Sequence, residues 1–204
     1  MEQRNLGGNS GHSIHKMTKV INFFGGPCCG KTGMSGQLFG LMKSKNINVA
    51  YVSEFATDLV WKNSLQCLDD QLYIFGEQNH RIYTLLNQVN YIITDCPILL
   101  SVHYLRTAYK KFNNESDNVI TWKDSIEDLI YETFMLYNNI NFQLERNTSK
   151  PYIQSGRFHT ETQAKAIDSE LNLLLDFYKI KRHKVNTFDQ IKDIMTCLES
   201  SFAG

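Results

Sequence analysis

The 204-residue sequence has only three prolines and five cysteines, and it contains no long apolar run. The cysteine count is odd, Cys28 and Cys29 are adjacent, and no C-x-x-C pair with zinc spacing occurs, so a disulfide framework is not indicated. No stretch approaches the roughly 18 apolar residues of a membrane-spanning helix. The first residues also lack the hydrophobic core of a secretory signal. We therefore predict a cytoplasmic protein with reduced thiols and no membrane partner.

An excess of charge of either sign is also missing, since lysine plus arginine and aspartate plus glutamate each total 21. This balance gives no electrostatic footprint for non-specific nucleic-acid binding, although it is compatible with a local basic site. Hydrophobic residues make up 42% and charged residues 21%, which is typical of a folded globular protein. The length suits one α/β domain with a sizeable core and is short for two.

The start of the chain differs in composition from the rest. Residues 1–16 contain glycine, serine, asparagine and histidine and offer little to bury. We predict that they form a disordered extension and that Met17 is a candidate natural start. Residues 17–204 then form a single domain without internal repeats.

Short apolar runs alternate with helical patterns from Lys19 onward. The expected strands are 20–24, 48–53, 91–95, 140–144 and 184–188. The expected helices are 31–45, 68–87, 124–134, 160–178 and one that Asp189 caps. Asp124 with Glu127, and Thr160 with Gln163, form capping-box patterns at two helix starts. Strands that alternate with helices predict an α/β fold with a parallel sheet covered on both faces.

The strongest motif is G-x-x-x-x-G-K-[ST], which lies between an expected strand and an expected helix. Its residues are Gly25, Gly26, Pro27, Cys28, Cys29, Gly30, Lys31 and Thr32. Its glycines permit positive φ angles and direct several N–H groups at one anion, and the dipole of the following helix adds positive potential. Lys31 is expected to neutralise the β- and γ-phosphates and Thr32 to bind Mg²⁺. The motif predicts a site for a nucleoside triphosphate such as ATP.

Three glycines continue this segment at helical spacing, namely Gly33, Gly36 and Gly40. Gly33 directly follows the motif, and we include it in the nucleotide-binding segment. Each glycine inside a helix lowers its stability by about 1 kcal/mol relative to alanine. Three glycines on one helix face therefore need an explanation. We interpret it as a face that packs closely on the sheet, with substrate approach as the alternative.

Two carboxylates end expected strands. Because the carboxyl ends of parallel strands meet at one edge, Glu54 and Asp95 should share a crevice with the glycine-rich loop. Asp95 follows the apolar run 91–94, as in a Walker B element, and is expected to hold Mg²⁺ through water. Glu54 is the candidate base that orients an acceptor hydroxyl and takes its proton, with Asp58 in reserve. The alternative for Glu54 is a solvated or helix-capping carboxylate.

Basic residues gather on the segment 146–159, which follows the fourth expected strand. Arg146, Lys150 and Arg157 lie there among proline and glycine. We predict a mobile lid whose cations stabilise a transferring phosphoryl group and whose closure excludes water. An ordinary basic surface loop is the alternative.

Four further side chains have either a functional or a structural role. Gln78 and Arg81, on the helix before Asp95, could bind the base or sugar of an acceptor, or could be ordinary helix residues. Cys28 and Cys29 lie beside a helix N-terminus and Lys31, a setting that lowers thiol pKa values and favours redox sensitivity. Their small size is the simpler reason for their presence.

The sequence resembles small P-loop kinase-type ATPases, including the ribosylnicotinamide-kinase-like AAA family common in bacteriophages. The resemblance lies in three segments: Phe24-Gly25-Gly26-Pro27…Gly30-Lys31-Thr32, Ser53-Glu54-Phe55-Ala56 and Thr94-Asp95-Cys96-Pro97-Ile98-Leu99-Leu100-Ser101. Two later segments are similar to that family's lid and the helix after it: Pro151-Tyr152…Gly156-Arg157…Thr160-Glu161 and Ala166-Ile167-Asp168. The resemblance covers about 19–188.

The resemblance implies a three-layer P-loop NTPase fold, with a five-stranded parallel sheet in the order 2-3-1-4-5 and helices on both faces. It also implies the roles given above for Lys31, Thr32 and Asp95. Two departures occur: Cys28-Cys29 stands where small glycine or serine is usual, and Gly33 replaces a second hydroxyl residue after the lysine. Neither departure removes a required group.

These features predict a kinase that uses ATP and Mg²⁺ to phosphorylate a small acceptor, either a nucleoside, a nucleotide or a related ribosyl compound. A kinase of a modified base in DNA is an alternative, against which the balanced charge argues mildly. A nucleotide-dependent switch or ATPase without a small-molecule acceptor is another. In that protein Glu54 would be dispensable.

Overall fold

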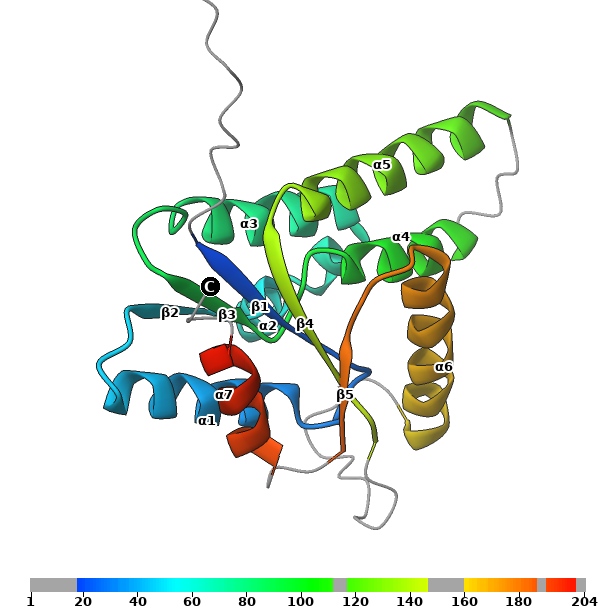
Figure 1. The fold of residues 1–204 in the computed structure, drawn as a ribbon. Helices are drawn as coiled ribbons and strands as arrows, with labels where there is room; N and C mark the ends of the chain where they lie inside the picture. Colours follow the sequence, from blue (N-terminus) through cyan, green and yellow to red (C-terminus); the bar gives the residue numbers. More distant parts are fainter. Residues whose placement is uncertain (1–17, 112–116, 147–159, 187–189, 201–204) are drawn as a thin grey trace, which may run out of the picture.

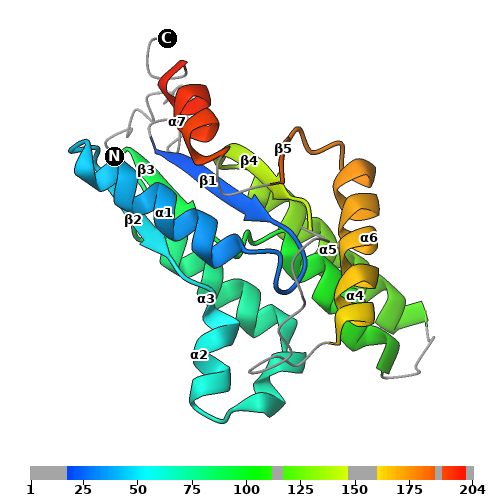
Figure 2. The same cartoon turned by 90° about the horizontal axis from the view of Figure 1, so that it is seen from below.

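The computed structural model describes residues 18–111, 117–146, 160–186 and 190–200. Five strands form one sheet in the order β2-β3-β1-β4-β5, and all four pairings are parallel. Helices cover both faces of this sheet (Figure 1), and a perpendicular view shows the same layers (Figure 2). The predicted α/β fold of a P-loop NTPase, with strand order 2-3-1-4-5, is confirmed.

The elements follow one another in the alternation that the sequence predicts. The strands are β1 (Lys19–Phe24), β2 (Val49–Val52), β3 (Tyr91–Thr94), β4 (Asn138–Leu144) and β5 (His183–Val185). The helices are α1 (Lys31–Ser44), α2 (Phe55–Trp61), the 3₁₀ helix η1 (Leu65–Asp69), α3 (Gln71–Tyr83), α4 (Leu100–Lys111), α5 (Asp117–Met135), α6 (Glu161–Phe177) and α7 (Ile191–Ser200). None of the described helices is long and apolar enough to cross a membrane.

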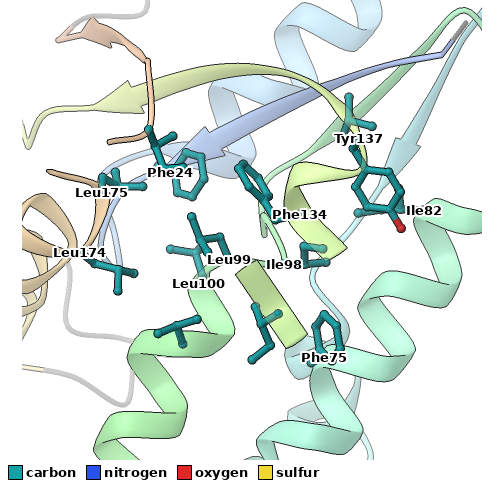
Figure 3. Packing of buried hydrophobic residues seen from close by; sticks show 14 of the residues in the cluster. Phe24, Phe75, Ile82, Ile98, Leu99, Leu100, Phe134, Tyr137, Leu174 and Leu175 are labelled. Atoms are coloured by element: carbon teal, nitrogen blue, oxygen red, sulfur yellow. The ribbon is translucent and has the colours of Figure 1, made fainter. Parts of the chain in front are cut away.

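Side chains of the central strand β1 alternate between two hydrophobic cores. Ile21 and Phe23 pack with buried residues of α1 and α7 on one face. Val20 and Phe24 face the other core, which α3, α4, α5 and α6 complete. Figure 3 shows this second core, where the ring of Phe24 meets that of Phe134 edge-on at 6.1 Å between centroids. Burial on both faces explains why β1 and β3 are mostly apolar, with the buried Asn22 as the exception inside β1.

Several expected helix boundaries are wrong. The expected helix 68–87 is divided at Asp70, whose carboxylate accepts a hydrogen bond from the Tyr73 N–H and starts α3 afresh. Leu72, an apolar residue of the expected helix, is exposed, whereas Phe75 and Ile82 are buried. Helix α5 already begins at Asp117, so Asp124 is no cap. The strand expected over 184–188 is β5, which ends at Val185, and Asp189 lies outside the described residues.

The start of α6 agrees with its predicted capping box. The Gln163 N–H donates to Thr160 Oγ1 at 3.3 Å, and the Thr160 N–H donates to Gln163 Oε1 at 2.8 Å. Each bond satisfies an N–H group that a helix start would leave without a partner. The apolar face of α6 is buried as expected, with Ala164 and Leu171 almost inaccessible.

The interpretation of the glycine face on α1 is wrong. Gly33, Gly36 and Gly40 are exposed, and a Cβ atom added to Gly36 or Gly40 would meet nothing within 4 Å among the described residues. The helix packs on the sheet through Met34 and Leu38 instead. Close packing therefore does not explain these glycines.

Candidate functional site

The glycine-rich loop connects the carboxyl end of β1 to the first turn of α1. Gly25 and Gly30 have φ angles of 149° and 95°, a region that glycine adopts easily and other residues avoid. Cys28 has a φ of 63°, so the departure from the usual glycine costs roughly 1–2 kcal/mol in backbone energy. A Cβ atom on Gly25 would collide with the Cys29 sulfur. The loop conformation therefore needs glycine at its first position.

The ammonium group of Lys31 is held across this loop. Its Nζ donates to the carbonyl oxygens of Gly25 at 2.8 Å and Gly26 at 3.1 Å. The N-cap Gly30 offers no side chain, so the first turn of α1 presents its N–H groups beside this cation without a side-chain cap. Converging N–H groups and a fixed positive charge are the groups that a polyphosphate site requires.

Asp95 lies at the carboxyl end of β3, directly opposite the start of α1. Thr32 Oγ1 donates to Asp95 Oδ2 at 2.6 Å. Asp95 is only 5% exposed, and its other oxygen, Oδ1, is buried without a hydrogen-bond partner among the described residues. A buried carboxylate oxygen without a partner is costly. Its position beside a threonine hydroxyl fits a hard cation that prefers oxygen ligands.

These residues fit Mg²⁺ in the manner expected for a site shared with phosphates. Among the described residues no group of three His, Cys, Asp or Glu side chains could hold a metal ion. Mg²⁺ commonly binds through one or two protein oxygens while phosphate and water oxygens complete its shell. Thr32 and Asp95 supply that number of protein oxygens.

Burial disfavours thiolate chemistry at Cys29. Burial raises the pKa of the Cys29 thiol, and the nearby Lys31 ammonium opposes this rise. The raised pKa keeps the reactive thiolate form scarce at neutral pH. Cys29 instead acts as a small side chain packed against Gly25.

Glu54 is the N-cap residue of α2, at the carboxyl end of β2. Its Oε2 accepts a hydrogen bond from Thr57 Oγ1 at 2.8 Å, and its side chain is half-buried. Burial raises the pKa of the Cys96 thiol well above its usual value, with Glu54 and Asp95 adding to the rise and Lys31 opposing it. Val52 pairs with Thr94, so Glu54 and Asp95 follow neighbouring strand ends, and the bond from Thr32 to Asp95 brings the loop to the same edge of the sheet.

Gln78 does not lie on the helix surface as the sequence argument assumed. It is only 1% exposed, and its amide is fully engaged with the protein. Gln78 Oε1 accepts from the Phe55 N–H at 2.8 Å, and Nε2 donates to the Ser53 carbonyl at 3.3 Å and to Thr94 Oγ1 at 3.4 Å. Gln78 thus ties the backbone on both sides of Glu54 to the end of β3.

We expect Gln78→Ala to lower the free energy of unfolding by about 2–4 kcal/mol, because the Ser53 carbonyl, the Phe55 N–H and the Thr94 hydroxyl lose their partner. Urea unfolding followed by circular dichroism measures this change. Gln88→Ala, at an exposed position, is the control and should stay within about 0.5 kcal/mol of wild type. Equal stability of the two variants would contradict the tying role of Gln78.

Arg81 and Asp58 form an ion pair next to Glu54. Arg81 Nη2 donates to Asp58 Oδ2, and the guanidinium carbon lies 4.9 Å from the centroid of the Phe55 ring. Both side chains are about one-third exposed. The Asp58 carboxylate, the reserve base, is thus already paired with a cation. The Arg81 guanidinium remains partly accessible near Glu54.

Sequence reasoning missed two tyrosines near the carboxylates. Burial raises the pKa of Tyr51 to about 12, the hydrogen bond with Ser35 at 3.0 Å opposes this rise, and Asp95 adds to it. Burial also raises the pKa of Tyr104, and the charge of Glu54 adds to the rise. Tyr51 lies in the strand that Glu54 ends, which was an available signal. Tyr104 lies in α4, which the sequence analysis did not expect.

No family model and no curated protein sequence matches this chain. Solved structures do match its fold. A NadR protein in complex with NR aligns with a TM-score of 0.57 and 16% identity over 84% of this chain and 46% of that one. A thymidylate kinase from Ehrlichia chaffeensis aligns with a TM-score of 0.58 and 15% identity over 89% of this chain and 99% of that one.

The chain has a P-loop kinase-like fold. It spans about half of the NadR chain and almost the whole thymidylate kinase chain. At these identities the likeness shows the fold, and the roles of individual residues rest on the geometry of this chain.

Within this P-loop kinase-like fold, Arg146 does not project from a loop as the lid argument assumed. Its side chain is only 11% exposed. Arg146 Nε donates to Asp168 Oδ2 at 2.6 Å, and Nη2 donates to the Pro27 carbonyl at 2.7 Å. The cation is thus brought to the glycine-rich loop but is paired there with the Asp168 carboxylate. Lys150 and Arg157, with the rest of the expected lid over 147–159, lie outside the described residues.

Proposed function

We propose that this chain is a kinase that uses ATP and Mg²⁺ to phosphorylate a small nucleoside, nucleotide or related ribosyl compound. The observation that carries the proposal is the meeting of three groups at the carboxyl edge of the sheet. These are the Lys31 ammonium in its glycine-rich loop, the Thr32–Asp95 pair with its unpartnered oxygen, and the Glu54 carboxylate. Phosphoryl transfer needs little more than positioning and charge stabilisation, which such a set supplies.

The nucleotide side of the proposal assigns each loop group a task. The segment from Gly25 to Gly33 surrounds the phosphates, with the N–H groups of the first turn of α1 directed at them. On nucleotide binding, Lys31 exchanges its loop carbonyls for β- and γ-phosphate oxygens. Thr32 and Asp95 would hold Mg²⁺, which offsets phosphate charge and polarises the transferring group.

The acceptor side begins at Glu54. Its carboxylate orients the acceptor hydroxyl and takes its proton as the hydroxyl oxygen bonds to the γ-phosphorus and the bond from that phosphorus to ADP breaks. Tyr51 and Tyr104 lie near this carboxylate, and the partly accessible Arg81 guanidinium offers donors to a base or sugar. Arg146 and Arg157 are proposed to stabilise the charge on the transferring group, with Arg146 held beside the loop by Asp168.

The comparisons support this acceptor class. One solved structure of the same fold was determined in complex with NR, and the other is a thymidylate kinase. We further propose that 17–204 is one domain and that the segment 146–159 acts as its lid. A kinase of a modified base in DNA and a switch without a small-molecule acceptor remain the competing functions, and one assay separates all three.

The assay offers labelled ATP and Mg²⁺ to the protein together with nucleosides, nucleotides, nicotinamide riboside or DNA. The proposal predicts that label moves to at least one small acceptor, and only in the presence of that acceptor. Transfer to DNA alone would favour the modified-base kinase. Label released solely as free phosphate, with every acceptor inert, would overturn the kinase proposal and favour the switch.

A further inference from the structure

We propose that Asp168 of α6 is a positioning residue that holds the phosphate-binding loop and Arg146 in the geometry that accepts a nucleotide. The inference rests on the proposed function, because it concerns the same site. Asp168 Oδ1 accepts the Gly26 N–H at 3.0 Å, and Oδ2 accepts Arg146 Nε at 2.6 Å. One carboxylate therefore connects α6, the loop after β1 and the residue after β4.

Arg146 also connects Asp168 to the loop through a second route. Its Nη2 donates to the Pro27 carbonyl at 2.7 Å and, more weakly, to the Ala164 carbonyl at 3.4 Å. The loop is thus held by the N–H of Gly26 and by the C=O of Pro27 at the same time. Bonds between charged side chains and backbone groups are among the stronger ones in proteins. Removing the Asp168 carboxylate deletes the hydrogen bond from the Gly26 N–H and the ion pair that holds Arg146.

Gly26 provides independent support for the contact. The G-x-x-x-x-G-K-[ST] motif leaves its second position open, yet here that position is glycine. A Cβ atom on Gly26 would collide with Asp168 Oδ1 and would lie 3.2 Å from the Ala164 carbonyl oxygen. The close approach of α6 to the loop therefore explains a glycine that the phosphate site alone does not require.

Asp168 is itself held by a rigid support. Asn172 Nδ2 donates to the Asp168 carbonyl oxygen at 3.0 Å, and Gln143 Nε2 of β4 donates to Asn172 Oδ1 at 2.8 Å. The position of α6 is thereby fixed against the central part of the sheet. A side chain supported in this way can pre-organise a loop, which lowers the ordering cost of ligand binding.

The test compares Asp168→Ala and Asp168→Asn with Asp176→Ala by calorimetry with ATP and Mg²⁺. Asp176 is the matched control, because it lies on the same helix and pairs with an arginine, Arg182, at 2.7 Å. We expect Asp168→Ala to weaken nucleotide binding about tenfold, the loss of roughly one charge-assisted bond. Asp168→Asn should have a smaller effect, since its amide oxygen still accepts the Gly26 N–H. Asp176→Ala should bind as wild type does.

A cycle with Gly26→Ala tests the contact from the loop side. In the wild-type background the added methyl group displaces the Asp168 carboxylate and weakens binding. In the Asp168→Ala background the collision is gone, so the same change should cost at least about threefold less. Additive effects of the two changes would overturn the inference.

Two outcomes of the binding experiment distinguish failure of this inference from failure of the proposed function. If wild type binds nucleotide and both Asp168 variants bind it equally well, with only a lower melting temperature, Asp168 serves stability alone and this inference fails. If folded wild-type protein binds no nucleotide, the proposed function fails first. Circular dichroism verifies folding, and Asp168→Asn replaces Asp168→Ala if the alanine variant does not fold.

Discussion

Glu54→Gln is expected to lower the rate of phosphoryl transfer by about 10²–10⁴-fold while ATP affinity stays close to wild type. The amide keeps the size and the hydrogen bond of the carboxylate with Thr57 but cannot take a proton. The nucleotide groups Lys31, Thr32 and Asp95 are untouched by this change. Single-turnover transfer to the best acceptor measures the rate, and calorimetry measures ATP affinity.

Two further variants sharpen this result. Glu132→Gln removes an equivalent carboxylate from an exposed position on α5 and should transfer phosphate normally. Asp58→Asn tests the reserve base, which is paired with Arg81. Full transfer by Glu54→Gln together with loss in Asp58→Asn would move the base to Asp58. Full transfer in both variants would show that neither carboxylate is the base.

Asp95→Asn is expected to lower kcat by about 10²–10³-fold and to raise the Mg²⁺ concentration needed for half-maximal activity. The variant can still accept the Thr32 hydroxyl bond, but it loses the negative charge beside the buried Oδ1 position. Because a neutral amide is a weaker ligand for Mg²⁺ than a carboxylate, phosphate charge is less well offset. Titration of the transfer rate with MgCl₂ measures both effects.

ATP binding measured without an acceptor tests the role of Asp95 in Mg²⁺ binding independently of the transfer rate. The Mg²⁺-dependent part of ATP affinity should shrink in Asp95→Asn, whereas affinity for ATP in EDTA should not fall. Asp176→Asn, an exposed carboxylate on α6, serves as the control and should show the wild-type Mg²⁺ dependence. An unchanged Mg²⁺ requirement in Asp95→Asn would remove Asp95 from the metal site.

Local sequence determined what could be predicted. The glycine-rich motif, the apolar strands β1 and β3 and the capping box of α6 all depend on residues close together in the chain. Once alternation indicated a parallel sheet, the carboxyl-edge rule placed Glu54 and Asp95 at one end of it. The strand order came from the family resemblance and agrees with the structure.

Contacts between distant parts of the chain were not predictable in this way. Gln78 has the polarity of a surface residue, and only its fit between β2 and β3 explains its burial. Arg146 reads as a lid cation until α6 brings Asp168 beside it. The glycines of α1 share a helical face, but periodicity does not say whether such a face packs on the sheet or faces solvent.

The central claim is that the loop from Gly25 to Thr32 binds a nucleoside triphosphate through converging N–H groups and the Lys31 ammonium. Calorimetric titration of the purified protein with Mg²⁺ and ATP, or GTP, tests it directly, with Lys31→Ala as the comparison. The account predicts a saturable heat with wild type and binding at least about 100-fold weaker in the variant, since the cation on the β- and γ-phosphates is lost. No heat of association with either nucleotide, or identical binding by Lys31→Ala, would contradict it.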